Sequence, residues 1–520
     1  MRVRPAALIA ACLALGWARS LAQETLPGTR PLAPQDDFSP RMVAGIERAL
    51  ARAEEEARAG RAQFWRRDTS SPAAYAASVA PNRERLRRIV GAIDARYAPA
   101  VIEYAGGPGR PAQVAETPAV RISAVRWPVF TGVHGEGLLL EPKGRARARV
   151  VALPDADETP EAAAGLVPGA NGWALRLAEA GCEVIVPALL DRRATWSGNP
   201  RIAMTDQTHR EWIWRQAYEL GRHVAGFEVQ TVAAVLDAWE ARSERLPVGI
   251  AGYGEGGLVA LYAAALDERI EAALVSGYFQ LREELWREPI YRRVWSLLKE
   301  FGDAEIASLV APRALVIEHS GGPRVEGPPV VDASRRKGAA PGAIVPPELA
   351  SVRGEVERVR AWGGDVELVT GAGGAPAGPL SPPALAALLR RLGVTEVPVA
   401  REPAAPARSF PPDADARQRR RVEEWSAFCQ ALQRRSEAGR EAWWQGVVAA
   451  PGVDWARAVQ PLRERCWDEL FGRLPGPSLP PNARSRKLEE RSDYAIWEVT
   501  LDVWPEVFAW GYLLIPHGLQ

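Results

Sequence analysis

The sequence predicts an α/β protein: a doubly wound, mostly parallel sheet with a helical N-terminal extension and the start of a second repeat. Short apolar runs alternate with helical segments between residues 149 and 392, which is the pattern of parallel strands joined by helices. A glycine-rich turn joins one of these runs to a helix at residues 252–257. Several segments of the N-terminal part recur after residue 437, which indicates an internal repeat.

Composition places the chain among globular proteins and excludes some partners. Its 520 residues are 47% hydrophobic and 25% charged, enough for more than one core. Basic and acidic residues number 65 and 64, so no charge excess favours nucleic acid. Beyond the first 22 residues, Cys182, Cys429 and Cys466 form neither a disulfide framework nor a zinc spacing. We expect no cofactor and no metal.

The first 22 residues have the pattern of a signal peptide. Arg2 and Arg4 precede an apolar stretch at 6–17, and residues 20–22 form a small-x-small cleavage site. Lipid attachment at Cys12 is the alternative. No later segment has 18 uncharged apolar residues, so we expect a secreted or periplasmic protein without stable membrane insertion.

The elements follow in order. Residues 23–120 form a Pro-rich leader and N-terminal helices, predicted over 41–67 and 82–97. An α/β domain is predicted over 121–395. Its expected strands are 121–126, 137–140, 149–153, 182–187, 248–251, 272–275, 314–318 and 366–370. Its expected helices are 162–180, 210–241, 258–266, 348–362 and 383–392.

The turn after strand 248–251 carries the main functional signal. Gly252, Gly254, Gly256 and Gly257 give the layout of a nucleophile elbow, G-x-S-x-G, with glycine in place of serine. A dinucleotide fingerprint, G-x-G-x-x-G, is the first alternative, but no carboxylate ends the next strand. A phosphate loop would need a Lys and a Ser or Thr that are missing. A plain tight turn is the remaining alternative.

Three matches indicate a tandem duplication. Residues 59–61 recur at 438–440, 127–128 at 504–505 and 137–144 at 511–518. We therefore expect a linker at 396–414 and an incomplete second repeat at 415–520, packed against the first domain. By these offsets the second elbow lies beyond residue 520, so we expect a fragment of a longer protein. The alternative is a natural terminus.

The motifs resemble those of secreted bacterial α/β-hydrolases of the dienelactone hydrolase and acetyl xylan esterase type. The resemblance covers roughly residues 121–392. It is most specific in REWIWRQAYELGRHVAG at 210–226, in the elbow, and in IASLVAPRALVIE at 306–318. It implies hydrolysis of carboxylic esters, such as acylated carbohydrate, by a Ser-His-Asp triad without a cofactor.

Most residues of this family's catalytic triad are missing from the matching positions of this sequence. The nucleophile position is Gly254, and the loop at 371–376, where the histidine is expected, contains none. The acid is expected near Glu318, with Glu326 and Asp332 as looser candidates.

Two other residues are weak catalytic candidates. Glu255 is a possible base, and its backbone N–H would help form an oxyanion hole. A glutamate at the start of a helix more commonly only stabilises the helix by interacting with the helix dipole. His319 follows a strand end, at the edge where such sheets bind ligands.

Two hypotheses follow. In the first, the visible domain is inactive and the working copy lies beyond the C-terminus of the sequence. In the second, the domain is a pseudoenzyme that binds a glycan or a partner domain. Tryptophans 196, 212, 214, 286 and 295 could stack on sugar rings, although at this spacing they are also typical of core packing.

Overall fold

The computed structural model describes residues 24–34, 37–198, 206–331, 338–395, 406–408, 413–448, 452 and 454–518. The signal-like segment with Cys12, most of the predicted linker and Asp332 lie outside these residues. The chain divides into two compact units, one of residues 57–458 and one of residues 1–56 with 459–520. These units do not follow the predicted boundaries, because the N-terminal segment groups with the end of the chain.

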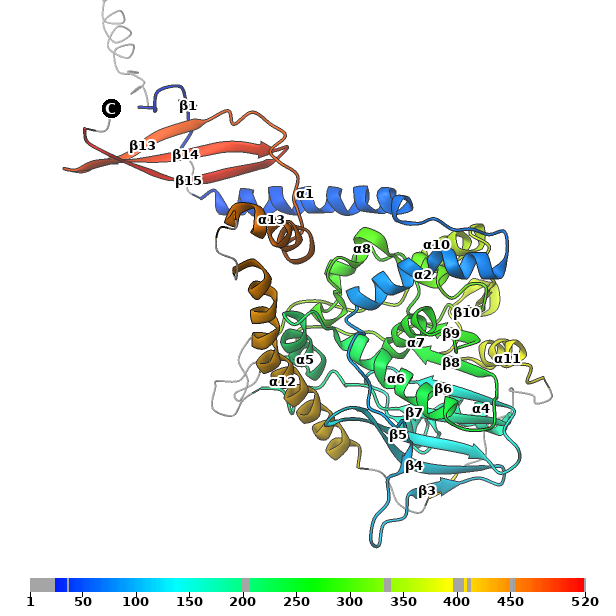
Figure 1. Cartoon of the computed structure of the whole chain (residues 1–520). Coiled ribbons are helices and arrows are strands. Elements are labelled where there is room, and N and C mark those ends of the chain that lie inside the picture. Colours follow the sequence, from blue (N-terminus) through cyan, green and yellow to red (C-terminus); the bar gives the residue numbers. More distant parts are fainter. Residues whose placement is uncertain are drawn as a thin grey trace, which may run out of the picture. The chain divides into compact units, whose positions relative to one another are not determined.

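The larger unit is built on an eleven-stranded sheet with the order β11-β10-β9-β8-β6-β7-β5-β4-β3-β12, and β2 pairs with β4 (Figure 1). The strands β7, β6, β8, β9, β10 and β11, in this order across the sheet, run parallel to one another, and β5 is antiparallel to β4 and β7. The strands are β2 (Glu103–Tyr104), β3 (Gln113–Glu116), β4 (Val120–Phe130), β5 (Val133–Pro142), β6 (Ala148–Leu153), β7 (Cys182–Pro187), β8 (Val248–Tyr253), β9 (Ala272–Ser276), β10 (Ala314–Glu318), β11 (Val366–Val369) and β12 (Ala407–Arg408).

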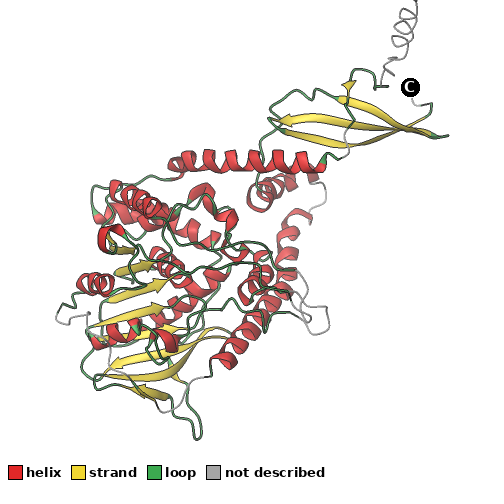
Figure 2. Cartoon of the chain, turned by 180° about the vertical axis from the view of Figure 1, so that it is seen from behind, coloured by secondary structure: helices red, strands yellow, loops and turns green. Residues whose placement is uncertain are grey.

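Helices accompany this sheet on both faces (Figure 2). They are α2 (Pro72–Ile89), α3 (Pro160–Ala163), α4 (Trp173–Glu179), α5 (His209–Tyr218), α6 (Val224–Glu240), α7 (Glu255–Leu266), α8 (Leu297–Glu300), α9 (Asp303–Ser308), α10 (Leu349–Ala361), α11 (Pro382–Arg391) and α12 (Ala414–Val448). Successive strand residues enter different cores: Val151 belongs to the buried cluster that includes residues of α2, α6 and α7, whereas Val150 belongs to the cluster that includes residues of α4 and α11. Such strands are buried on both faces, which explains why they read as continuous apolar runs. The predicted mixed α/β class with a mostly parallel sheet is confirmed, and the fold is α/β-hydrolase-like.

Two predicted helices are interrupted. The helix expected over 210–241 is α5 and α6, because Gly221 adopts a φ of 66° after Leu220 and His223 begins a new helix. The Nδ1 atom of His223 accepts a hydrogen bond from the N–H of Ala225 at 3.0 Å. The helix expected over 162–180 is α3 and α4, separated by a loop with three positive-φ glycines, at 165, 169 and 172. Local glycine conformation therefore outweighed the helical periodicity.

The second N-terminal helix begins earlier than predicted. It was expected over 82–97, but α2 starts after Ser71, whose side chain accepts a hydrogen bond from the N–H of Ala74. Pro72 occupies its first turn, where the missing N–H costs nothing. The helix ends before Gly91, which has a φ of 66°.

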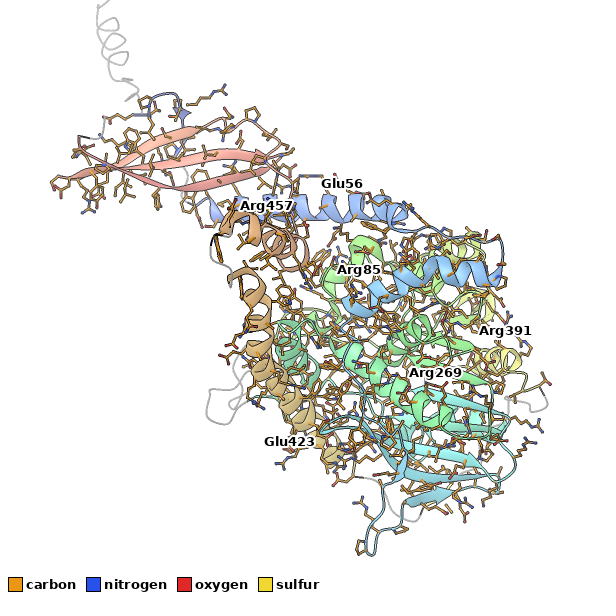
Figure 3. All side chains as sticks on the ribbon, in the orientation of Figure 1. Glu56, Arg85, Arg269, Arg391, Glu423 and Arg457 are labelled. Carbon is orange, nitrogen blue, oxygen red and sulfur yellow. The ribbon has the colours of Figure 1, made fainter. Side chains whose placement is uncertain are left out.

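Helix α12 packs along the larger unit, although the sequence placed it in the second repeat. Its aromatic residues contact the hairpin β4–β5 and α6: Phe428 stacks on Phe130 at 4.8 Å, and Trp425 stacks on Phe227 at 4.4 Å. Glu423, labelled in Figure 3, lies on the exposed side of this helix. The apolar face of α12 is therefore part of the core of the larger unit.

The smaller unit contains a four-stranded sheet with the order β1-β13-β14-β15 and most of helix α1 (Ser39–Gly60). Its strands are β1 (Arg30–Pro31), β13 (Arg484–Glu490), β14 (Tyr494–Trp504) and β15 (Val507–Pro516). In sequence, α13 (Trp455–Arg465) and a π-helical turn (Cys466–Phe471) precede it. Among the described residues, no helix is both long enough and apolar enough to cross a membrane.

The hairpin β14–β15 has the same form as β4–β5. Trp504 pairs with Val507 across one turn, and Phe130 pairs with Val133 across the other. This register sets equivalent residues 374 positions apart, as in the match of 137–144 with 511–518. The same register places Trp127 and Trp504 at different positions relative to their turns. The sequence match of residues 127–128 with 504–505 is therefore not a structural equivalence.

Candidate functional site

The glycine turn lies where the sequence placed it, between β8 and α7 at the carboxyl edge of the sheet. Gly254 has φ 58° and ψ −118°, a conformation that L side chains rarely adopt. Backbones also approach closely here: a Cβ at Gly252 would lie 2.0 Å from the carbonyl oxygen of Gly256. At Gly256 it would lie 2.1 Å from the carbonyl oxygen of Leu153. The strained strand-to-helix bend of an elbow is therefore present without its nucleophile.

The space that a nucleophile would occupy at position 254 is filled. A Cβ there would lie 2.3 Å from Oδ1 of Asp155 and 3.0 Å from Cγ of Pro323. Asp155 follows β6, the strand next to β8 in the sheet. Its Oδ1 also accepts a hydrogen bond from the backbone N–H of Glu255 at 2.9 Å. The N–H expected to donate to an oxyanion is thus already bound to a carboxylate.

Asp155 is held in this position by Arg192, which follows β7. The guanidinium donates from Nη1 to Oδ2 at 2.6 Å and from Nη2 to Oδ1 at 3.0 Å, and both side chains are buried. Burial acts to raise the pKa of Asp155, but Arg192 outweighs it, so the pKa lies below its usual value. Arg192 also donates to Asp157 at 2.8 Å. The paired carboxylate therefore stays charged beside the elbow.

Glu255, a weak catalytic candidate from the sequence, is the centre of a second group of ion pairs. Its Oε1 accepts from Arg292 at 2.6 Å and from Arg192 at 3.3 Å, and its Oε2 accepts from Arg210 at 3.4 Å. The side chain is 1% exposed. Burial acts to raise the pKa of Glu255, but the three guanidinium groups hold it well below its usual range. Such a carboxylate is a poor proton acceptor near neutral pH.

The ion pairs continue away from Glu255. Arg210 makes a two-pronged contact with Glu228 at 2.8 and 2.9 Å. Arg292 donates to Glu288 at 2.9 Å, and Glu288 also accepts from Arg282 at 2.8 Å. Buried charges of both signs alternate through this network, which is the condition under which burial of charge is tolerated.

Glu318, at the end of β10, binds the start of α11. Its Oε2 accepts from the hydroxyl of Ser276 at 2.6 Å and from the N–H of Leu380 at 2.7 Å, and its Oε1 accepts from the N–H of Ser381 at 2.9 Å. Burial raises the pKa of Glu318 above its usual value. The carboxylate thus holds the two backbone N–H groups that directly precede α11, and the hydroxyl of Ser276 is committed to the same carboxylate.

His319 faces the loop that precedes α10. Its Nε2 hydrogen-bonds the carbonyl oxygen of Pro347 at 3.2 Å, and the side chain is buried. The loop at 371–376 forms a short 3₁₀ turn (Ala372–Gly374) and carries no histidine. Of the looser acid candidates, Glu326 is exposed in its loop. The structure therefore places the predicted site residues in separate contacts rather than in a triad.

A different histidine forms a carboxylate pair. His209, at the start of α5, donates from Nδ1 to Asp191 at 2.5 Å and accepts from the N–H of Trp196 at Nε2, at 2.8 Å. Both ring nitrogens are therefore used within the fold. In the part of the chain that the structure describes, no three His, Cys, Asp or Glu side chains are placed to hold a metal ion.

Sequence reasoning missed Asp155, Arg192 and Arg292. A signal existed for Asp155, because it stands directly after a buried strand whose end lies at the ligand-binding edge of such sheets. No comparable signal marks Arg192 or Arg292 among the many arginines of the chain. Their role depends on neighbours that are distant in sequence.

Comparison with known proteins agrees with the fold. Residues 161–284 match the family model described as the Dienelactone hydrolase family. “Putative hydrolase YtaP” of Bacillus subtilis (strain 168) is 33% identical over 109 residues, which are 19% of this chain and 36% of that relative. The chain thus spans about a third of the length of this curated relative. The predicted resemblance is confirmed: the larger unit contains a segment similar to the dienelactone hydrolase family.

Solved structures that are similar to part of this chain include the following two. A “putative acetyl xylan esterase” from Bacteroides fragilis NCTC 9343 is 15% identical, covers 57% of this chain and 75% of its own, and has a TM-score of 0.40. An acetyl xylan esterase from Paenibacillus sp. R4 is 16% identical, covers 61% and 93%, and has a TM-score of 0.37.

Proposed function

We propose that the dienelactone-hydrolase-like domain of this protein is a pseudoenzyme. In it, a buried arginine–carboxylate network has replaced the catalytic site. One observation carries the proposal. The Asp155 carboxylate lies where the side chain of a nucleophile would begin, and it binds the N–H of Glu255. The site thereby stabilises the fold instead of breaking bonds.

The chemistry of acyl transfer supports this proposal. Such transfer needs a nucleophile, a base and donors for the developing oxyanion. Gly254 has no hydroxyl, and the loop at 371–376 has no imidazole. An oxyanion would also meet the negative charge of Asp155 instead of a free N–H. Each of the three requirements is therefore missing for a separate reason.

The test is an ester hydrolysis assay on the 520-residue chain with a generic acyl ester such as p-nitrophenyl acetate. We expect the rate to equal that of a buffer blank and to be unchanged in Glu255→Gln and His319→Ala. Turnover by the unmodified chain that either substitution abolishes would refute the proposal.

A second function is proposed from the repeat, because β14–β15 has the same form as β4–β5. A complete second repeat would carry its own elbow, and we assign to it the hydrolysis of carboxylic esters, such as acylated carbohydrate. The signal-like N-terminus suits secretion or the periplasm. A form of the protein with a complete second repeat should hydrolyse acyl esters, whereas the 520-residue chain should not. Equal rates would contradict this assignment.

The domain itself has a proposed non-catalytic role, which is to bind a glycan or a partner domain. Thermal unfolding of the chain with and without xylo-oligosaccharides tests glycan binding. A rise in the unfolding midpoint with ligand concentration supports it. An unchanged midpoint at millimolar ligand counts against it.

A further inference from the structure

A cavity of about 320 Å³ lies at the carboxyl edge of the sheet, apart from the glycine turn. Its walls are the loops that follow β6 and β7, at 156–160 and 188–193, and the first residues of α12, at 414–418. All three segments belong to the larger unit. A volume of this size is at the lower end of the range for pockets that hold small molecules.

Carboxylates outnumber guanidinium groups in the walls of this cavity. The charged lining residues are Asp157, Glu158, Asp191, Asp415, Arg193 and Arg417. Both arginines are already paired, because Arg193 donates to Asp191 and to Asp415, each at 2.6 Å. Arg417 donates twice at 2.8 Å to Glu161, which lies outside the lining. The cavity therefore has an excess of negative charge.

Glu158 is the lining carboxyl that lacks a cation. Asp157 accepts from Arg192 at 2.8 Å, whereas no arginine, lysine or histidine among the described residues pairs with Glu158. The Oε1 atom of Glu158 accepts a long hydrogen bond, 3.4 Å, from the indole of Trp173. Burial raises the pKa of Glu158, and the charge of Asp155 adds to this shift. A cation in the cavity would supply the charge that Glu158 lacks.

Gln418 gives an independent sign of a missing donor. This side chain is 9% exposed, and its Nε2 donates to the carbonyl oxygen of Leu189 at 2.7 Å. Its Oε1 has no hydrogen-bond partner in the described part of the chain. A buried acceptor without a donor costs free energy. A water molecule could satisfy Gln418, but it would leave the charge of Glu158 unmatched.

We propose that this cavity binds an aliphatic ammonium ion. Such a group carries one positive charge and three N–H donors. Glu158 and Gln418 would each accept one of these donors, and the more exposed carboxylates Asp157 and Asp415 would supply further negative charge. Binding needs no catalysis, so the proposal does not depend on whether the domain hydrolyses esters.

The first experiment is isothermal titration calorimetry of the 520-residue chain at pH 8 in phosphate buffer, because Tris is itself an amine. Two amines are compared with uncharged counterparts of similar shape: putrescine with 1,4-butanediol, and Nα-acetyl-lysine amide with Nα-acetyl-norleucine amide. We expect saturable binding of at least one amine, with a Kd of about 1 mM or tighter, and none of its counterpart.

The pattern of binding also identifies the source of the ammonium group. Binding of putrescine alone indicates a free polyamine, and binding of the lysine derivative indicates a lysine side chain. Either result supports the proposal. Binding of neither amine, or equal binding of an amine and its uncharged counterpart, would refute it.

The second experiment locates the site with variants. Glu158→Gln keeps the shape of the side chain and removes its charge, so we expect the bound amine to be held at least about tenfold more weakly. Gln418→Met removes the amide acceptor and should weaken binding about threefold or more. Glu284→Gln is the matched control, because Glu284 belongs to an exposed pair with Arg287. Equal affinity in Glu158→Gln and Glu284→Gln would overturn the proposal.

Discussion

Arginines are buried in two regions of the larger unit, and the two regions differ in how the charge is met. Around Glu255, the guanidinium groups of Arg192, Arg210 and Arg292 each donate to carboxylates. In α12, Arg421 is 1% exposed, and none of its three nitrogens has a hydrogen-bond partner among the described residues. Burial lowers the pKa of Arg421 from its ordinary value.

The nearest carboxylates explain this difference. Burial of Arg421 is partly offset by Glu136, Glu228 and Glu424, but each of these already accepts hydrogen bonds from another arginine. A buried charge costs little only when it is paired. The buried charges around Glu255 are therefore paired, whereas the contact between α12 and the sheet leaves the charge of Arg421 unpaired among the described residues.

The largest expected loss of stability comes from a substitution in the region around Glu255. Glu255→Gln removes the carboxylate that three buried guanidinium groups share, leaving fewer negative charges than positive ones in the buried network. We expect the free energy of unfolding to fall by about 3–5 kcal/mol, as measured by urea denaturation. Glu357→Gln is the control, since its pair with Arg360 is exposed and should contribute less than about 0.5 kcal/mol. A loss below about 1 kcal/mol at Glu255 would contradict this interpretation.

A smaller loss is expected when the same region is disturbed through the backbone. In Gly254→Ser the new Cβ would lie 2.3 Å from Asp155, so the carboxylate must move away from Arg192. We expect the free energy of unfolding to fall by about 2–3 kcal/mol, without any gain of esterase activity. Gly393→Ser is matched, because Gly393 has a φ of 72° and open space around its Cβ position. It should cost about 1 kcal/mol. Equal losses of stability at both positions would mean that Asp155 can move away from position 254 at little cost in free energy.

A substitution of Arg421, in the second region, should raise the free energy of unfolding. Arg421→Met replaces a buried, unpaired charge by an apolar chain of similar length, so we expect a gain of about 2 kcal/mol in the free energy of unfolding. Arg417→Met is the control on the same helix. Arg417 binds Glu161 through two contacts of 2.8 Å, and its loss should destabilise the protein. Destabilisation by both substitutions would show that Arg421 has a partner after all.

Glu158 sharpens the comparison, because a carboxyl can respond to burial by protonation whereas a guanidinium cannot. Burial raises the pKa of Glu158 to about 7; the indole of Trp173 opposes this shift and Asp155 adds to it. The folded state then binds more protons than the unfolded state, so this contribution to stability is present at low pH and lost as pH rises through about 7.

The corresponding measurement follows unfolding between pH 5 and pH 7.5. Glu158 should lower the free energy of unfolding by about 1–2 kcal/mol across this range, and Glu158→Gln should remove that part of the dependence. An unchanged pH profile in the variant would assign the dependence to other groups.

The sequence predicted the sheet well because its central strands are buried on both faces. The run at 248–251 reads as a strand whatever its neighbours are, and the glycines after it demand a sharp turn. Helix ends were harder to predict, since the break at Gly221 depends on one residue's backbone conformation. The contacts around Gly254 were not predictable, because Arg192 and Asp155 meet across 37 residues of sequence. The absence of a hydroxyl at position 254 and of an imidazole at 371–376 could be read directly from the residues of these two segments.

The backbone of Gly254 also bears on how this domain could evolve. A serine at position 254 would meet both an unfavourable dihedral angle and an occupied volume. It would fit only if Asp155 were also replaced by a smaller residue, which would leave Arg192 without its two-pronged partner. A hydroxyl at this turn therefore requires changes at two positions, and each change made alone destabilises the domain.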